Sequence, residues 1–117
     1  MGKLTTHVLD TSAGIPAAGV RIEVYDVMGA ARVLIAKQTT GADGRCTAPL
    51  LEGGELRRGR YQLVFKLADY FHGRGVALSD PAFLEEASIR LGIAAPEQNY
   101  HVPLLITPWS YSVYRGG

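Results

Sequence analysis

The sequence has 117 residues, of which 12 are Lys or Arg and 11 are Asp or Glu, so its formal net charge is +1. This balance leaves no field of one sign to hold a polyanion, which argues against nucleic acid as a partner. A single cysteine excludes an intrachain disulfide, and no apolar run is long enough for a membrane-spanning helix. We therefore expect one soluble domain over residues 1–117, without a membrane partner, and we expect it to be cytoplasmic because no apolar signal core follows Met1.

The first half of the chain predicts four short strands, at residues 4–10, 20–25, 31–40 and 46–51. The clearest is 20–25, in which β-branched residues alternate strictly with polar ones, so that one face is buried and the other meets water. The same alternation in the first strand puts His7 with Thr5 and Leu9, on the face opposite Val8.

A tight reversal is predicted at Gly41-Ala42-Asp43-Gly44, because Asp-Gly readily supplies the positive φ that such turns need. Arg45 follows this turn directly, at the start of the strand predicted at 46–51.

The second half predicts a strand at 61–67, one helical turn within 69–75 that its glycines stop, and a segment at 83–93 that fits either a helix start or a strand. We take a strand at 86–91 there. Roughly eight short strands with a turn signal about every ten residues indicate an all-β sandwich or barrel.

The last stretch, residues 99–117, predicts two strands around the turn at Thr107-Pro108. In the first of them, Val102 and Leu104 share one face and His101 lies on the other. After the turn, Val113 lies on one face, while Ser112 and Tyr114 lie on the opposite one.

No single polar residue in these strands identifies a site by itself. Three widely spaced histidines lack the ligand spacing of zinc motifs, and no Gly-x-Ser-x-Gly elbow is present. Cys46 follows a cation that would lower its pKa, but a small buried cysteine is the more frequent case. His72 lies among glycines and is expected at the surface.

Three segments in order resemble the 5-hydroxyisourate hydrolases, the transthyretin-related enzymes of urate breakdown. The resemblance covers essentially the whole chain, is weakest over residues 73–95, and is most specific at the terminal Tyr-Arg-Gly. The segments are Leu4-Thr5-Thr6-His7-Val8-Leu9-Asp10-Thr11, Ala42-Asp43-Gly44-Arg45-Cys46, and Tyr100-His101-Val102-Pro103-Leu104-Leu105 with Ser110-Tyr111-Ser112-Val113-Tyr114-Arg115-Gly116.

The resemblance implies a transthyretin-like β-sandwich of two four-stranded sheets with one short helical turn. It also implies a homotetramer, a dimer of dimers whose sites lie in the channel between the dimers. The implied activity is hydrolysis of 5-hydroxyisourate to 2-oxo-4-hydroxy-4-carboxy-5-ureidoimidazoline in purine degradation, with no metal or other cofactor.

The family's site positions fall on His7, Arg45 and His101 as catalytic residues. The substrate-binding positions implied are His7, Arg45, Ser112, Tyr114 and Gly117. Such a site would work by general acid and base attack of water on a ring amide, and which histidine is the base stays open. The family usually ends Tyr-Arg-Gly-Ser, whereas Gly117 occupies the serine position here.

Two readings compete with the enzyme. A transthyretin-like carrier shares the fold outline, but carriers of the thyroid-hormone type lack the combined histidine, arginine and Tyr-Arg-Gly set. A β-sandwich interaction module explains the strands and leaves His7, Arg45, His101 and Tyr114 as a coincidence. The presence of all four favours the hydrolase.

Overall fold

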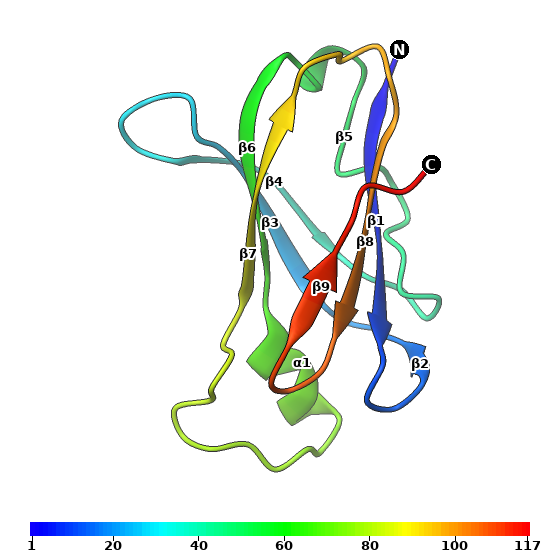
Figure 1. The fold of residues 1–117 in the computed structure, drawn as a ribbon, viewed down its shortest axis with the longest axis vertical. Coiled ribbons are helices and arrows are strands. Elements are labelled where there is room, and N and C mark those ends of the chain that lie inside the picture. The colour runs from blue at the N-terminus through cyan, green and yellow to red at the C-terminus, as the bar shows by residue number, and fades with distance from the viewer.

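The computed structural model describes residues 1–117 as two packed β-sheets with one short helix at their base (Figure 1). The first sheet has the strand order β2-β1-β8-β9, with β5 also paired to β1. The second has the order β4-β3-β6-β7. The strands of the first sheet are β1 (Lys3–Asp10), β2 (Ile15–Pro16), β5 (Leu51–Glu52), β8 (Tyr100–Ile106) and β9 (Tyr111–Val113). Those of the second are β3 (Arg21–Asp26), β4 (Val33–Thr39), β6 (Gly59–Phe65) and β7 (Ala87–Ile93).

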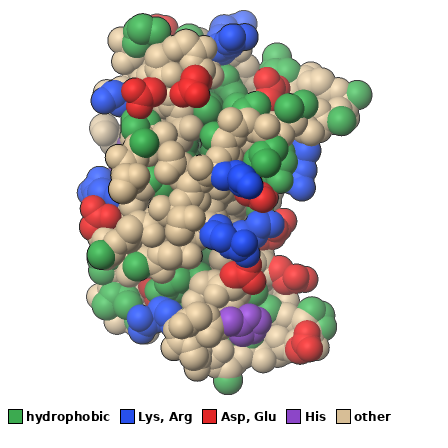
Figure 2. All heavy atoms as spheres, turned by 180° about the vertical axis from the view of Figure 1, so that it is seen from behind, with side chains coloured by type: hydrophobic (Ala, Val, Ile, Leu, Met, Phe, Trp, Pro, Cys, Tyr) green, Lys and Arg blue, Asp and Glu red, His purple; other side chains and the backbone are tan.

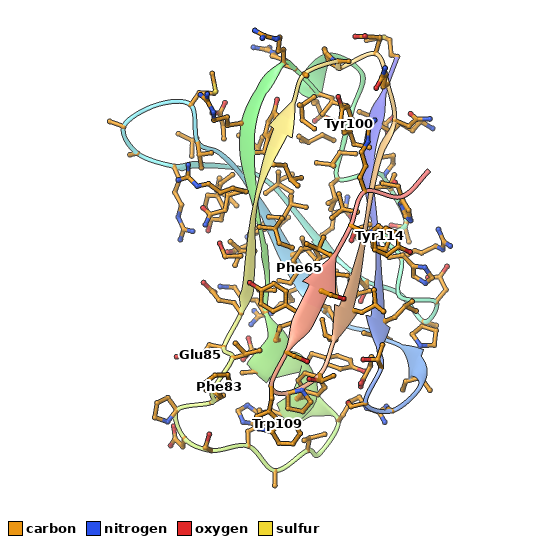
Figure 3. The ribbon with its side chains drawn as sticks, viewed as in Figure 1. Phe65, Phe83, Glu85, Tyr100, Trp109 and Tyr114 are labelled. Atoms are coloured by element: carbon orange, nitrogen blue, oxygen red, sulfur yellow. The ribbon has the colours of Figure 1, made fainter.

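The predicted β-sandwich is confirmed, with a first sheet of five strands where four were expected. The alternation of the sequence decides which side chains fill the space between the sheets. Leu4 and Val8 of β1 and Leu104 of β8 are fully buried there, facing Val24 and Leu63 of the second sheet. Figure 3 shows Phe65 and Tyr100 between the two layers.

The strand predicted at 46–51 is wrong over most of its length. Only Leu51–Glu52 pairs as β5, and a 3-10 turn, η1 (Gly53–Glu55), follows it. Residue 45 forms an isolated bridge to β1, and the segment between bridge and β5 is irregular. The apolar run there supplies buried side chains such as Leu50, and these do not require a regular ladder.

The predicted helical turn is the helix α1 (Leu67–Gly73), which begins two residues earlier than the sequence indicated. Leu67, Tyr70 and Phe71 form its buried face, and His72 is exposed on the helix and not in a loop. No helix in the structure is both long and apolar enough to cross a membrane.

A buried carboxylate fastens α1 to the first sheet. Asp10, at the end of β1, is 1% exposed and accepts the Tyr70 hydroxyl at 2.9 Å. Burial by itself would raise the pKa of Asp10, but hydrogen bonds from Ser12, Tyr70 and the backbone of Ala13 outweigh it and hold that pKa below its ordinary value. The same contact and burial raise the pKa of Tyr70 to about 12, with burial the larger cause.

Replacing Tyr70 by Phe removes this bond and should lower the free energy of unfolding at pH 7 by about 2 kcal/mol, because the acceptor is a buried charged group. The depressed pKa of Asp10 means that the stabilisation is present above the unfolded-state pKa and is lost as the pH falls through the folded-state value. In urea unfolding, the difference in the free energy of unfolding between the wild type and Tyr70→Phe should therefore become smaller in acid.

Tyr25→Phe is the matched control, since the Tyr25 hydroxyl donates to Glu23 at 2.8 Å on the outer face of the second sheet. Tyr25→Phe should lower the free energy of unfolding clearly less than Tyr70→Phe does, because water can replace the lost hydrogen bond. Equal losses in the two variants at pH 7 would contradict an anchoring role for Asp10.

Candidate active site

The outer face of the first sheet carries the predicted site residues in three rows. Strands β1 and β8 run parallel with Thr5 opposite His101, and β9 pairs antiparallel with the other side of β8. Leu104 pairs with Val113 and His101 bridges to Gly116, so the same register sets Tyr114 opposite Pro103. The rows are Thr5–His101–Gly116, His7–Pro103–Tyr114 and Leu9–Leu105–Ser112. Neighbouring rows are about 7 Å apart along the strands.

Pro103 ends the regular pairing of β8 with β9 just before Tyr114. Because proline has no N–H to donate, the pairing between β8 and β9 stops at Val113 and resumes only at Gly116, whose N–H donates to the His101 carbonyl at 2.7 Å. The Tyr114 side chain is 59% exposed, and Figure 3 shows it beside β8 and β9.

The turn at 41–44 brings Arg45 beside His7. The Gly44 N–H donates to the Gly41 carbonyl, which closes the predicted reversal, and the Val8 N–H donates to the Gly44 carbonyl at 2.9 Å. Gly44 has φ +78°, and a Cβ there would lie 2.3 Å from the Val8 carbonyl oxygen. Only glycine therefore allows the turn to dock this closely on β1, where residues 7 and 45 form a bridge.

The same turn fixes the imidazole of His7. Its Nε2 lies 2.8 Å from the carbonyl oxygen of Asp43. A carbonyl only accepts, so Nε2 carries the hydrogen and the neutral ring has its lone pair on Nδ1. The turn thus determines the tautomer of His7 as well as the position of Arg45.

The imidazole of His101 is held from two sides. Its Nδ1 lies 2.8 Å from Oγ1 of Thr5, its partner in the row. On the other side is Gly116, where a Cβ would come within 2.8 Å of His101 Cδ2. The glycine of the terminal Tyr-Arg-Gly is therefore the residue that leaves room for this ring.

Burial lowers the pKa of His101, and the charges of Arg45 and then His7 lower it further. His101 is half-buried. Arg45 and His7 belong to different segments of the chain, yet the charge of each acts on His101. A neutral imidazole is the form that can accept a proton.

Arg45 has no carboxylate partner. The ion pairs of the protein join Arg21 to Asp69, Lys66 to Glu23 and Glu86, and Arg74 to Asp10. The exposed guanidinium of Arg45 accordingly keeps its donors free, beside a cavity of about 200 Å³ lined by Thr5, Thr6, Arg45, Cys46 and Ala48. Such a fork of donors suits a carbonyl or an oxyanion.

Cys46 is half-buried at this cavity, and burial followed by the charge of Asp43 raises the pKa of its thiol. A raised pKa opposes the thiolate form, which agrees with the structural role expected for Cys46. No three His, Cys, Asp or Glu side chains gather as a candidate metal group.

The remaining predicted residues lie apart from this centre. Ser112 is exposed two rows away from His101, a separation of about 13 Å along the strands. Gly117 is exposed next to Gly116, with no atom within 4 Å of an added Cβ. Their roles in binding substrate stay predictions.

Sequence reasoning missed three contributors. Thr5 could have been found, because its register partner in a parallel pair is His101. The role of Gly116 could be recognised only once the position of the His101 ring was known. Arg115 turns inward, where its guanidinium lies 4.1 Å from the centre of the Tyr100 ring and donates to the Asn99 carbonyl, so it fastens the terminal segment and leaves the outer face to its neighbours.

Comparison with known proteins gives a consistent result. The family model described as HIUase/Transthyretin family matches residues 4–116. The 5-hydroxyisourate hydrolase of Pseudomonas aeruginosa is 54% identical over 99% of this chain and 92% of its own, and that of Ralstonia nicotianae is 51% identical over 99% of each.

Solved structures extend the comparison. An (S)-allantoin synthase matches with a TM-score of 0.93 at 41% identity over 99% of this chain, which spans only 44% of that protein. The Klebsiella pneumoniae 5-hydroxyisourate hydrolase matches over 100% of both chains with a TM-score of 0.81 at 32% identity. Sea bream transthyretin in complex with thyroxine matches over 97% of this chain and 94% of its own, with a TM-score of 0.86 at 26% identity.

The electrostatic link between Arg45 and His101 predicts a measurable change. Arg45→Gln removes a positive charge that disfavours the imidazolium, so the pKa of His101 should rise towards its ordinary value. An NMR titration of the His101 ring measures this directly. Arg58→Gln, at an exposed position outside the site, is the control and should leave the titration unchanged. An unaltered pKa in Arg45→Gln would mean that the guanidinium does not act on His101.

Proposed function

The chain belongs to the HIUase/Transthyretin family, and from this premise we propose that it hydrolyses 5-hydroxyisourate. The 5-hydroxyisourate hydrolases of Pseudomonas aeruginosa and Ralstonia nicotianae are 54% and 51% identical over nearly its full length, whereas the thyroxine-binding transthyretin is 26% identical. Fold likeness is shared by both groups, so the identity and the site chemistry carry the assignment. The chain is a hydrolase of a cyclic amide-like substrate in urate degradation.

One observation supports this function above the others, namely an arginine without an acidic partner beside two differently fixed histidines. Opening the ring requires a base for the water, donors for the oxyanion that develops on the carbonyl, and an acid for the leaving nitrogen. His7, Arg45 and His101 offer these three kinds of group on one sheet face. We infer that the reaction needs no further cofactor.

We assign the proton transfers to His7 and His101 and the oxyanion to Arg45. The lowered pKa keeps His101 neutral near physiological pH, which suits it to take the proton of the attacking water. Water then adds to the ring carbonyl, and the C–N bond breaks as the nitrogen receives a proton. The hydroxyl of Tyr114, in the row next to His101, is proposed to orient the substrate, with Ser112 and Gly117 at the margin of the pocket.

A face of one sheet becomes a pocket only when another surface covers it. We propose that the covering surface is a second copy, in a tetramer built as a dimer of dimers. The short strand β9 leaves its outer edge unpaired, and Val113 is 38% exposed there. Beside it runs a groove of about 340 Å³ between β9 and β7, the free edge of the other sheet. We further propose that the enzyme acts in the cytoplasm.

The activity is tested with fresh 5-hydroxyisourate, generated by urate oxidase and followed by its ultraviolet decay. The protein should accelerate the decay, and His101→Ala should lower kcat by about 10²–10⁴, the usual contribution of general acid–base catalysis. His72→Ala, the third histidine, exposed on α1, should retain wild-type turnover. A wild-type protein that leaves the spontaneous rate unchanged would favour the carrier function, and a fully active His101→Ala would remove His101 from the mechanism.

The assembly is tested by the mass of the particle in solution, which should correspond to four chains. Val113→Glu sets a charge on the free edge of β9 and should yield smaller, inactive particles. Val33→Glu, on the exposed edge strand β4, should leave the tetramer intact. An active monomer would contradict the shared pocket.

A further inference from the structure

The hydroxyl of Thr5 and the imidazole of His101 depend on each other for hydrogen bonding. Thr5 Oγ1 lies 2.8 Å from His101 Nδ1, and neither group has any other hydrogen bond within the chain. The contact is built into the fold, because Thr5 and His101 are direct partners in the parallel register of β1 and β8. Thr5 takes no part in the reaction steps proposed above.

The contact decides which ring nitrogen meets the substrate. Nδ1 is turned towards β1 and occupied by Thr5, so Nε2 is the nitrogen left without a protein partner. Gly116 closes the Cδ2 side of the ring. Both groups restrict rotation of the ring, and the orientation of the ring sets the direction from which a proton can arrive.

We propose that Thr5 is a positioning residue of the hydrolytic site, which holds His101 by Nδ1 and so directs every proton exchange with water through Nε2. This inference rests on the proposed function and adds to it a residue that does not touch the reacting atoms. It also names the nitrogen that acts.

A hydroxyl suits this position because it can both donate and accept by rotating. In the reactive tautomer the Nδ1–H donates to Thr5 Oγ1, and the lone pair on Nε2 takes a proton from water. The water oxygen bonds to the carbonyl carbon, and the C=O electron pair moves onto the carbonyl oxygen, the oxyanion assigned to Arg45. The imidazolium keeps its Nδ1–H bond to Thr5. Nε2 then gives up this proton, and the nitrogen of the breaking C–N bond receives one proton from the pair of His7 and His101. In the other neutral tautomer the Thr5 hydroxyl rotates and donates to Nδ1.

His7 offers a contrast within the same site. Its partner is a backbone carbonyl, which can only accept, so its hydrogen stays on Nε2. The two histidines therefore leave opposite nitrogens without a protein partner, Nδ1 for His7 and Nε2 for His101.

The test uses Thr5→Val, which keeps the β-branched shape of a strand residue and removes only the hydroxyl. We expect kcat to fall about tenfold with KM within about twofold, as for the loss of one oriented hydrogen bond. The pKa of His101 should fall further, because the imidazolium loses the acceptor for its Nδ1–H. Thr5→Ser should restore both quantities.

Thr11→Val is the matched control, since Thr11 donates to a backbone carbonyl of β8 at 3.3 Å, outside the site. It should leave kcat and the pKa of His101 unchanged. The pKa is measured by 15N NMR of the imidazole, which needs no turnover.

Thr5→Val with wild-type kcat and an unshifted His101 pKa would overturn the proposal, as would equal losses in Thr5→Val and Thr5→Ser. Absence of activity in the wild type would instead refute the hydrolase assignment, and the NMR shift would still report whether Thr5 holds the ring.

Discussion

The parallel pairing of β1 with β8 is the constraint on which the rest of the structure depends. These strands lie near the two ends of the sequence, and their register runs without a break from Leu4 opposite Tyr100 to Asp10 opposite Ile106 (Figure 1). Parallel neighbours require a long crossover, and here the whole second sheet and α1 lie within it. A slip of one residue would turn every side chain of β1 to the opposite face, which would expose Leu4 and Val8 and carry His7 to the inner face, away from His101.

Close fits at two glycines complete the site on this frame. Gly44 admits the turn that supplies both the acceptor for His7 and the cation of Arg45, while Gly116 admits the ring of His101. Both are backbone approaches that any side chain would obstruct. Arg115 packs over the Tyr100 ring and so keeps the terminal segment beside β8 where Pro103 interrupts the pairing with β9. The three residues of the Tyr-Arg-Gly sequence thus differ in what they do. Tyr114 is exposed on the outer face, Arg115 anchors the terminal segment, and Gly116 leaves room for the His101 ring.

The sequence predicts the sandwich because period-two alternation is strong in β1, β3, β6 and β8, and these strands were located to within two residues. It also predicts that His101 lies on the face opposite Val102 and Leu104. It fails at 46–51, where apolar residues fill the core without pairing, and it locates α1 imprecisely, since glycines mark only where a helix ends. Contacts between segments, such as Thr5 with His101 or Gly116 with the imidazole ring, follow from register and packing, which alternation alone does not specify.

The two outer faces of the sandwich differ in how their charges are balanced, and this difference explains where chemistry is possible. On the second sheet Lys66 lies between Glu23 and Glu86, and the back of the molecule shows basic and acidic side chains next to one another (Figure 2). Paired charges of this kind have little left to offer a ligand. On the first sheet burial and then the charge of Arg45 lower the pKa of His101, so an arginine without an ion pair acts on an imidazole that favours its neutral form. In the proposed mechanism, negative charge developing on a bound carbonyl would pair with Arg45 and weaken one of the two charges that lower the pKa of His101. Proton uptake by His101 and oxyanion formation would then favour each other, which is the coupling that hydrolysis by water requires.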